Sequence, residues 1–219
     1  MEAADSPNLP VAESSRSGAI SGGCMAKAHA NHRNVGIDCQ YVLTKVFGHP
    51  EYKGKQKEIV EAALQGADVF VVAPTGMGKS LCFQVPAIAE DHGVTVVISP
   101  LLALMKNQVS RLRQHKVAVG SLTSETPKYE KDEIIEDLSN PHVSTRLLYK
   151  KLHTNDFIRI LNQVYQRQEL TRLVVDEAHC ISEWGHDFRT EYRRLGQFRQ
   201  KFPDVPIMAL TASATALTI

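Results

Sequence analysis

Several features that would assign this chain to a specialised class of protein are scarce or absent. Only 4 cysteines occur in 219 residues, scattered and without a C-x-x-C pair, which argues against a disulfide framework or a zinc site and favours a reducing compartment. The net charge of +1 shows no general excess of basic residues, so any surface for a polyanion must be local. The longest apolar run, residues 94–105, is interrupted by polar residues and proline and is too short to cross a bilayer. With no secretory signal either, the chain is expected to be soluble and intracellular, without a membrane partner.

The rest of the sequence has the composition and pattern of one globular domain. With 43% hydrophobic and 22% charged residues, a chain of this length can bury a sizeable core. Residues 1–38 are rich in Ala, Ser, Gly and Asn and lack an apolar period, so we expect a disordered tail there and a folded domain over residues 39–219. Helices are expected at residues 41–47, 55–64, 79–90, 101–115, 128–138, 155–166 and 191–202. Strands are expected at residues 69–72, 94–98, 117–122, 145–149, 172–176 and 207–211. This alternation predicts an α/β fold with a parallel sheet covered by helices on both faces.

A phosphate-binding loop is indicated directly after the first apolar strand, residues 69–72. The loop consists of Ala73 followed by Pro74, Thr75, Gly76, Met77, Gly78, Lys79 and Ser80. Its two glycines let the backbone turn and aim N–H groups at phosphate oxygens, and the N-terminus of the following helix attracts the same anion. Lys79 is placed to reach the β- and γ-phosphates, and the Ser80 hydroxyl to complete the shell of a Mg²⁺ ion. The alternative is a chance glycine turn between a strand and a helix.

Two carboxylates end a second buried strand, in the sequence Leu173-Val-Val-Asp-Glu-Ala-His179. Asp176 is placed to hold Mg²⁺, often through water. Glu177 is the natural general base, positioning a water for attack on the γ-phosphate. Alternatively, the pair is an acidic turn that caps a following short helix. The presence of a phosphate-binding loop in the same chain favours the catalytic interpretation.

The order of these motifs, followed by Thr-Ala-Ser-Ala-Thr at residues 211–215, resembles the superfamily-two helicases. The run Asp-Glu-Ala-His-Cys-Ile-Ser-Glu-Trp-Gly-His-Asp-Phe-Arg at residues 176–189 closely resembles the RecQ family of ATP-dependent 3′-to-5′ DNA helicases. Residues 47–48 and 52–56 are similar to the adenine-recognition motif of that family, and residues 99–105 with Gln108 to its first strand-contact motif. The resemblance covers residues 41–219 and implies the first RecA-like, P-loop NTPase domain of such a helicase, with ATP and Mg²⁺ as cofactors.

The resemblance also implies a role for residues that bind the base of the nucleotide. An amide such as that of Gln56 can pair with N6 and N7 of adenine and so select ATP. Tyr52 offers a ring and Lys53 a charge against the base. Lys53 stands where the family usually has Arg, which weakens a planar stack.

A loop that couples DNA to ATP hydrolysis is implied after the acidic pair. It alternates aromatic and charged side chains, namely Trp184, His186, Asp187, Phe188 and Arg189. Such a loop can stack on bases and sense phosphate charge close to the metal carboxylate. The alternatives are core packing for Trp184 and Phe188 and a solvated helix face for the basic residues that follow.

The family resemblance implies an ATP-dependent DNA helicase that acts in recombination and repair, on single-stranded DNA and on duplexes with a 3′ tail. It also implies nuclear localisation if the source has a nucleus. Two departures bear on activity. The family continues from Leu-Tyr into a Thr-Pro-Glu turn that is missing after Tyr149, and no second motor domain follows within the 219 residues, so this chain alone is expected to be inactive or very slow. The alternatives are a nucleotide- and DNA-binding module without turnover, and an RNA helicase of the Asp-Glu-Ala-His type, against which residues 180–189 argue.

Overall fold

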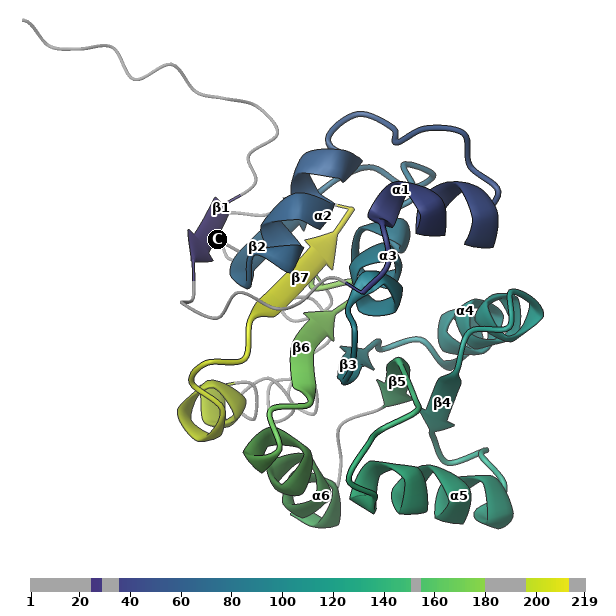
Figure 1. Ribbon diagram of the computed structural model, residues 1–219, viewed down its shortest axis with the longest axis vertical. Coiled ribbons are helices and arrows are strands. Elements are labelled where there is room, and N and C mark those ends of the chain that lie inside the picture. The colour runs from purple at the N-terminus through teal and green to yellow at the C-terminus, as the bar shows by residue number, and fades with distance from the viewer. Residues whose placement is uncertain (1–24, 29–35, 151–154, 180–195, 213–219) are drawn as a thin grey trace, which may run out of the picture.

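The computed structural model describes residues 25–28, 36–150, 155–179 and 196–212 (Figure 1). Its strands are β1 (Met25–Ala28), β2 (Ala67–Val72), β3 (Val94–Ile98), β4 (Val119–Leu122), β5 (Leu147–Lys150), β6 (Leu170–Val175) and β7 (Ile207–Thr211). Its helices are α1 (Cys39–Tyr41), the π-helical turn η1 (Val42–Val46), α2 (Gln56–Leu64), α3 (Leu81–Ala89), α4 (Leu102–Gln114), α5 (Lys128–Ser139) and α6 (Asn155–Gln166). Residues 196–201 are also helical. No helix in these ranges is long and apolar enough to cross a membrane.

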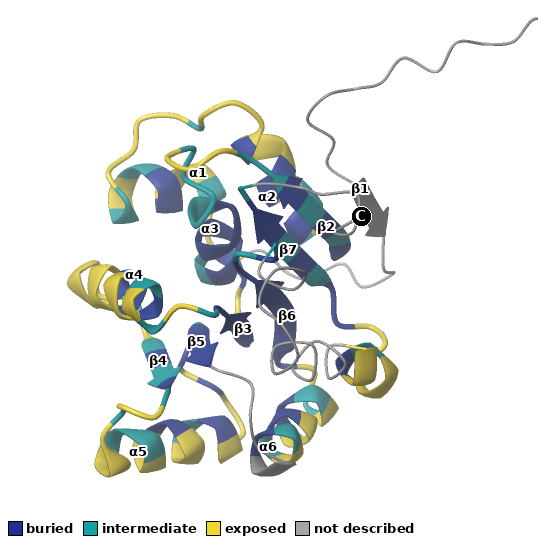
Figure 2. Cartoon of the chain, turned by 180° about the vertical axis from the view of Figure 1, so that it is seen from behind, coloured by how far each residue is buried: buried dark blue, intermediate teal, exposed yellow. Residues whose placement is uncertain are grey.

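The strands form one sheet in the order β1-β2-β7-β6-β3-β5-β4, and every pairing from β2 onward is parallel. The sheet is covered on both faces, as alternate residues of β3 illustrate. Val96 lies in a core cluster with residues of α5 and α6, whereas Val97 lies in a second cluster with residues of α2, α3 and α4. Figure 2 shows the buried strands between helices whose outer faces are exposed. The predicted α/β architecture is confirmed.

The parallel topology brings the carboxyl ends of β2, β7, β6 and β3 to the same end of the sheet. In the register of the strands, Val72 of β2 lies beside Thr211 of β7, and Val175 of β6 lies beside Ile98 of β3. Both candidate motifs begin at the residue that follows one of these strands. In parallel sheets, ligands bind at the carboxyl ends of strands, so this end is the expected place for a site.

The structure differs from the predicted disordered tail at residues 25–28 and 36–38, the part of that tail that it describes. Met25–Ala28 form β1, which pairs antiparallel with β2, from Met25 opposite Phe70 to Ala28 opposite Ala67. Further along, the amides of Gly36 and Ile37 donate to the carbonyl of Ala89, at 2.9 and 3.1 Å. A strand at a sheet edge is held by backbone hydrogen bonds, which need no apolar period, and this explains why composition did not reveal it.

An ion pair is buried on the face of the sheet that α2 and α3 cover. Arg172, in β6, has no exposed surface, and Glu90, at the end of α3, is 2% exposed. The guanidinium donates to Glu90 at 3.0 Å and to the carbonyl of Ala63 at 2.5 Å. Two helices of one layer are thereby fastened to the central strand.

Candidate nucleotide site

The loop after β2 has the backbone that its glycines predict. Gly76 and Gly78 have φ angles of 88° and 73°, in the left-handed region that side chains disfavour. The loop starts at Ala73, whose N–H donates to the carbonyl of Thr211 at 3.0 Å, and ends at α3. Predicted loop residues Pro74 and Thr75 lie before the first of these turns, and the N–H of Met77 donates to the carbonyl of Pro74 at 3.3 Å.

Lys79 and Ser80 lie between the second turn and the helix. The ammonium group of Lys79 donates to the carbonyl of Ala73 at 2.9 Å, so it folds back across the loop that it closes. Ser80 precedes the first residue of α3, and its carbonyl accepts the N–H of Gln84 at 3.0 Å. The helix therefore starts two residues later than predicted, because Lys79 and Ser80 still belong to the loop.

Gln56 holds the loop from the side. Its amide nitrogen donates to the carbonyls of Met77, at 2.8 Å, and Gly78, at 3.2 Å, while its oxygen accepts the N–H of Lys53 at 2.8 Å. A Cβ atom on Gly78 would lie 2.7 Å from the amide nitrogen of Gln56, so only glycine allows this approach. Gln56 is 3% exposed, and both ends of its amide bond to the protein itself.

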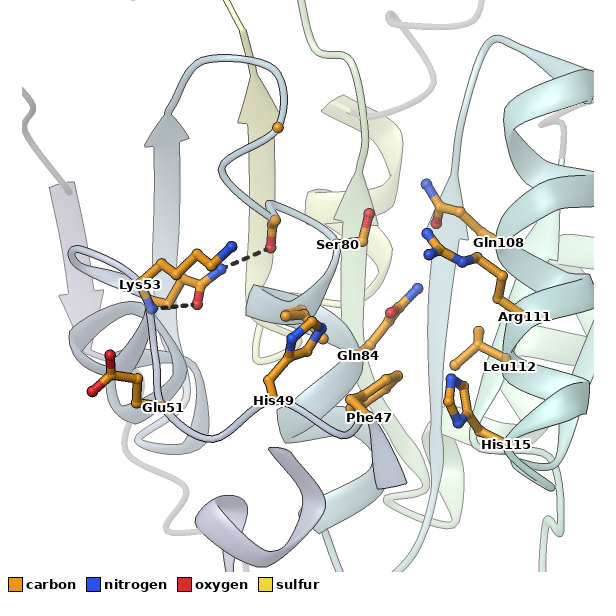
Figure 3. Close-up of a pocket in the computed structure, with 14 residues that line it drawn as sticks. Phe47, His49, Glu51, Lys53, Ser80, Gln84, Gln108, Arg111, Leu112 and His115 are labelled. Carbon is orange, nitrogen blue, oxygen red and sulfur yellow. Dashed lines mark hydrogen bonds between the residues drawn. The ribbon is translucent and has the colours of Figure 1, made fainter. Parts of the chain in front are cut away.

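A cleft of about 350 Å³ opens beside the loop (Figure 3). Several predicted residues line it, namely Lys53, Gln56, Gly76, Gly78 and Ser80. In Figure 3, Lys53 lies across the cleft from Arg111 and His115, which belong to or directly follow α4. Phe47 contacts the His115 ring edge-on, with 5.5 Å between centroids. The sequence alone did not reveal that α4 lines the cleft, because strand order and not a local motif brings this helix here.

Tyr52 does not line this cleft. Its ring packs against the cluster that contains Val42, Leu43 and Val60, and its hydroxyl is buried. Burial raises the pKa of Tyr52 to about 12. In this structure the ring therefore belongs to the support of α2 and α3.

Asp176 follows β6 at the same end of the sheet and is 4% exposed. One carboxylate oxygen accepts the side-chain amide of Gln108 at 3.1 Å, and the other accepts the N–H of Glu177 at 3.0 Å. Burial raises the pKa of Asp176, and the hydrogen bond from Gln108 and the charge of Lys79 oppose that rise. A buried carboxylate of this kind is suited to a cation, which favours its ionised form.

Glu177 is held in a strained conformation next to it. Its φ angle is 52°, which is unusual for a residue with a side chain. Its carboxylate lies 3.3 Å from Nδ1 of His179, and the same nitrogen lies 3.1 Å from the hydroxyl of Thr211. Backbone strain in a sheet-edge turn that carries two carboxylates is a common property of functional sites.

Thr211 connects the two motifs. Its carbonyl accepts the N–H of Ala73 at the start of the loop, and its hydroxyl contacts His179 beside the acidic pair. Strand β7, which Thr211 ends, lies between β2 and β6. The structure thus brings the phosphate-binding loop and the acidic pair together around one residue.

The two oxygen donors predicted for a metal, the Ser80 hydroxyl and the Asp176 carboxylate, are of the kind that suits a magnesium ion whose other ligands are phosphate and water. No group of three or more His, Cys, Asp or Glu side chains suited to a metal occurs in the described ranges. Mg²⁺ is usually held by one or two protein oxygens plus substrate phosphates and water.

The predicted DNA-coupling residues lie outside the part of the chain that the structure describes. They are Trp184, His186, Asp187, Phe188 and Arg189.

Comparison with known proteins places this chain among helicases. Residues 53–218 match the DEAD/DEAH box helicase family. The chain is 44% identical over 174 residues to "ATP-dependent DNA helicase Q-like 4B" of Arabidopsis thaliana, covering 78% of this chain and 15% of that protein. It is 43% identical over 180 residues to "ATP-dependent DNA helicase RecQ" of Haemophilus influenzae, covering 81% of this chain and 28% of that protein. The chain therefore spans only a small part of the length of these relatives.

A solved structure with the same fold is that of the DUF1998 helicase MrfA bound to DNA and AMPPNP. The TM-score is 0.65 at 17% identity, with 90% of this chain and 29% of that chain covered. Together with the sequence matches, this confirms both the predicted RecA-like fold and the predicted resemblance. The chain belongs to the DEAD/DEAH box helicase family, and the relatives it matches are RecQ-like ATP-dependent DNA helicases.

Proposed function

We propose that this chain is the first motor domain of a DNA helicase that couples ATP hydrolysis to 3′-to-5′ unwinding in recombination and repair. The observation that supports this best is the meeting of the loop and the acidic pair at Thr211, which contacts Ala73 on one side and His179 on the other. The relatives, which are ATP-dependent DNA helicases by name, support the choice of ATP and DNA.

The loop binds the phosphates of ATP in this proposal. The backbone N–H groups at Gly76 and Gly78 and the N-terminus of α3 face the phosphate oxygens. Lys79 exchanges its bond to Ala73 for the β- and γ-phosphates. Ser80 and Asp176 would hold Mg²⁺, and the ion would neutralise charge on the phosphates.

Glu177 acts as the general base. Its backbone is left-handed, and one of its carboxylate oxygens lies 3.3 Å from Nδ1 of His179, which holds it in place. The other oxygen is then available to orient the attacking water. Because phosphoryl transfer depends mainly on positioning and charge neutralisation, a fixed carboxylate is more useful than a mobile one.

The base and DNA contacts follow the family resemblance. In this proposal Lys53 and Gln56 lie at the adenine end of the cleft. Tyr52 packs against Val60 of α2, and the carbonyl of Met77 accepts the Gln56 amide. Trp184, His186, Asp187, Phe188 and Arg189 sense single-stranded DNA or a duplex with a 3′ tail. In a eukaryotic source, such an enzyme works in the nucleus.

Nucleotide binding and hydrolysis test the proposal separately. A fluorescent ATP analogue should bind the 219-residue chain with Mg²⁺. Lys79→Ala should weaken that binding by about 100-fold or more, because it removes the ammonium group proposed to contact the β- and γ-phosphates. Lys57→Ala, an exposed change on α2, is the matched control. Unchanged binding by Lys79→Ala would show that the site lies elsewhere.

Hydrolysis should be measured with and without single-stranded DNA, in this chain and in a fusion to the second motor domain of a RecQ-like relative. An arginine supplied by such a domain is worth roughly 10³ to 10⁵ in rate. We expect stimulation by DNA in the fusion and near-background hydrolysis in the chain alone. Stimulation by RNA and not DNA, or no stimulation, would contradict the assignment to DNA helicases.

A second candidate function is nucleotide binding without turnover. It is favoured by the hydrogen bond from the Lys79 ammonium to the Ala73 carbonyl, which occupies a catalytic group within the protein itself. Binding without hydrolysis, in the fusion as well as in the chain, would support this candidate instead.

A further inference from the structure

A buried chain of hydrogen bonds runs from the helix of the phosphate-binding loop to Asp176. The amide of Gln84, in α3, donates to the hydroxyl of Tyr149, in β5, at 3.1 Å. That hydroxyl donates to the amide oxygen of Gln108, in α4, at 2.8 Å. The amide nitrogen of Gln108 donates to Asp176 at 3.1 Å. Four elements of the fold are thereby joined through side chains alone.

The charge of Asp176 fixes the direction of this chain. An ionised carboxylate only accepts hydrogen bonds, so Gln108 must present its NH₂ group to Asp176 and its oxygen to Tyr149. The single proton of the phenol must then point to Gln108, which leaves the phenol oxygen to accept from Gln84. Every donor points towards the carboxylate, and each hydrogen bond polarises the next in the same sense.

The chain is shielded from water along its length. Tyr149 has no exposed surface, and Gln84, Gln108 and Asp176 are 6%, 7% and 4% exposed. Buried polar groups lose free energy when a partner is removed, because water is not there to replace it. Such a network has one satisfied arrangement, so it restricts how the four elements can shift relative to one another.

Both ends of the chain lie next to a residue proposed to hold Mg²⁺. Gln84 is one helical turn after Ser80 and donates its backbone N–H to the Ser80 carbonyl at 3.0 Å. Gln108 contacts the carboxylate of Asp176 directly. Ser80 and Asp176 belong to different strand–helix units, and the phenol of Tyr149 is the central link between them.

We propose that Tyr149 is a positioning residue that sets the distance and orientation of Ser80 relative to Asp176. Tyr149 touches neither nucleotide nor metal in this role and acts through Gln84 and Gln108. The inference rests on the proposed function, because it assumes that Ser80 and Asp176 hold the same ion. It adds a residue of β5 that neither the loop motif nor the acidic motif contains.

Tyr149→Phe tests the proposal, since it removes only the hydroxyl. We expect the Mg²⁺ concentration at half-saturation of ATP-analogue binding to rise by about 10-fold at most. That is the lower end of the effect of losing a direct partner of a metal ligand, and Tyr149 acts one bond further away, through Gln108. Binding of the analogue in EDTA should change by less than about 2-fold, because the loop itself is untouched. The matched control is Tyr165→Phe, in α6. It removes a hydroxyl that donates to Asp204 at 3.2 Å.

A double-mutant cycle with Asp176→Asn separates positioning from general damage. If Tyr149 acts through Asp176, Tyr149→Phe should have little further effect on Mg²⁺ dependence in the Asp176→Asn background. An unchanged Mg²⁺ half-saturation in a folded Tyr149→Phe protein would overturn the proposal, as would an equal loss of binding with Mg²⁺ and with EDTA. If Tyr149→Phe does not fold, Gln84→Leu decides by the same two measurements. Absence of Mg²⁺-dependent binding in the unmodified chain would instead refute the proposed function.

Discussion

The side-chain amide of Gln56 donates a hydrogen bond of 2.8 Å to the carbonyl of Met77, inside the phosphate-binding loop. The same amide bonds to Gly78 and to the N–H of Lys53, so both of its N–H donors and one acceptor position of its oxygen are used within the protein. Bidentate pairing with adenine needs one N–H donor of the amide and would require Gln56 to give up its bond to Met77 or to Gly78. The structure therefore supports a role for Gln56 in shaping the loop.

Replacing Gln56 should test whether it shapes the loop or reads the base. We expect Gln56→Ala to lower the affinities for ATP and GTP by similar factors of about 10, because the loop loses its lateral support for both nucleotides alike. A factor of about 10 corresponds to about 1.4 kcal/mol, close to the net value of one hydrogen bond. Titration of both nucleotides against the variant and against the exposed control Gln114→Ala measures this. A loss confined to ATP would show that Gln56 recognises adenine directly.

Glu177→Gln should separate binding from hydrolysis. The substitution keeps the shape of the side chain but removes the base, so hydrolysis in the fusion with a second motor domain should fall by roughly 100-fold or more while ATP stays bound. Single-turnover assays with labelled ATP measure both quantities. The control is Glu133→Gln, an exposed change on α5. Hydrolysis at the normal rate would assign the base to another residue.

Lys150 should make stability depend on pH. It is 9% exposed, its ammonium lies 3.9 Å from the centre of the Phe157 ring, and burial, followed by the charge of Lys131, lowers its pKa from 10.5 to about 8. The unfolded chain therefore binds this proton more tightly than the folded chain. The cost of burying the charged Lys150 lowers the free energy of unfolding by its full amount below about pH 8. This cost decreases as the pH rises from about 8 towards 10.5, so the folded state gains stability over that range.

We accordingly expect Lys150→Met to stabilise the chain at pH 7 by on the order of 1 kcal/mol, with the cation–π contact offsetting part of the gain. The difference should shrink as the pH approaches 10. Urea denaturation at both pH values measures it, and Lys57→Met, at an exposed site, should change little. A variant less stable than the parent at pH 7 would mean that the ring contact outweighs desolvation.

Breaking the buried ion pair should be costly, and removing both partners much less so. Glu90→Leu leaves Arg172 charged and enclosed, which typically costs about 3–5 kcal/mol. The double variant Glu90→Leu/Arg172→Met removes both charges and should recover most of that loss. Chemical denaturation of both variants tests this. Equal destabilisation by the two would indicate that packing, and not charge, dominates at this position.

Local patterns predicted the elements whose ends carry strong signals. The bounds of β3, α6 and β7 agree with the predictions, because apolar runs there end at clear turn or capping residues. The loop and acidic motifs could also be located from the sequence alone, because each is defined by the spacing of a few neighbouring residues. Helix α3 begins later than predicted because Lys79 and Ser80 complete the loop before the helix starts.

Features that depend on long-range register were not predictable. The link from Gln84 to Tyr149 joins residues 65 positions apart, and that from Gln108 to Asp176 joins residues 68 apart. Whether such side chains meet is decided by strand order and by the face that each residue takes, not by neighbouring residues. The wall of the cleft that α4 provides has the same origin.

Strand β1 has a practical consequence for how this domain is produced. It occupies the outer edge of β2, whose backbone groups would otherwise be open along residues 67–70. A shortened chain that begins at residue 36 would keep both motifs but expose this edge as a template for a second molecule. Such a version should be more prone to self-association in concentrated solution, so residues 25–28 should be retained when the domain is expressed for crystallisation or binding assays.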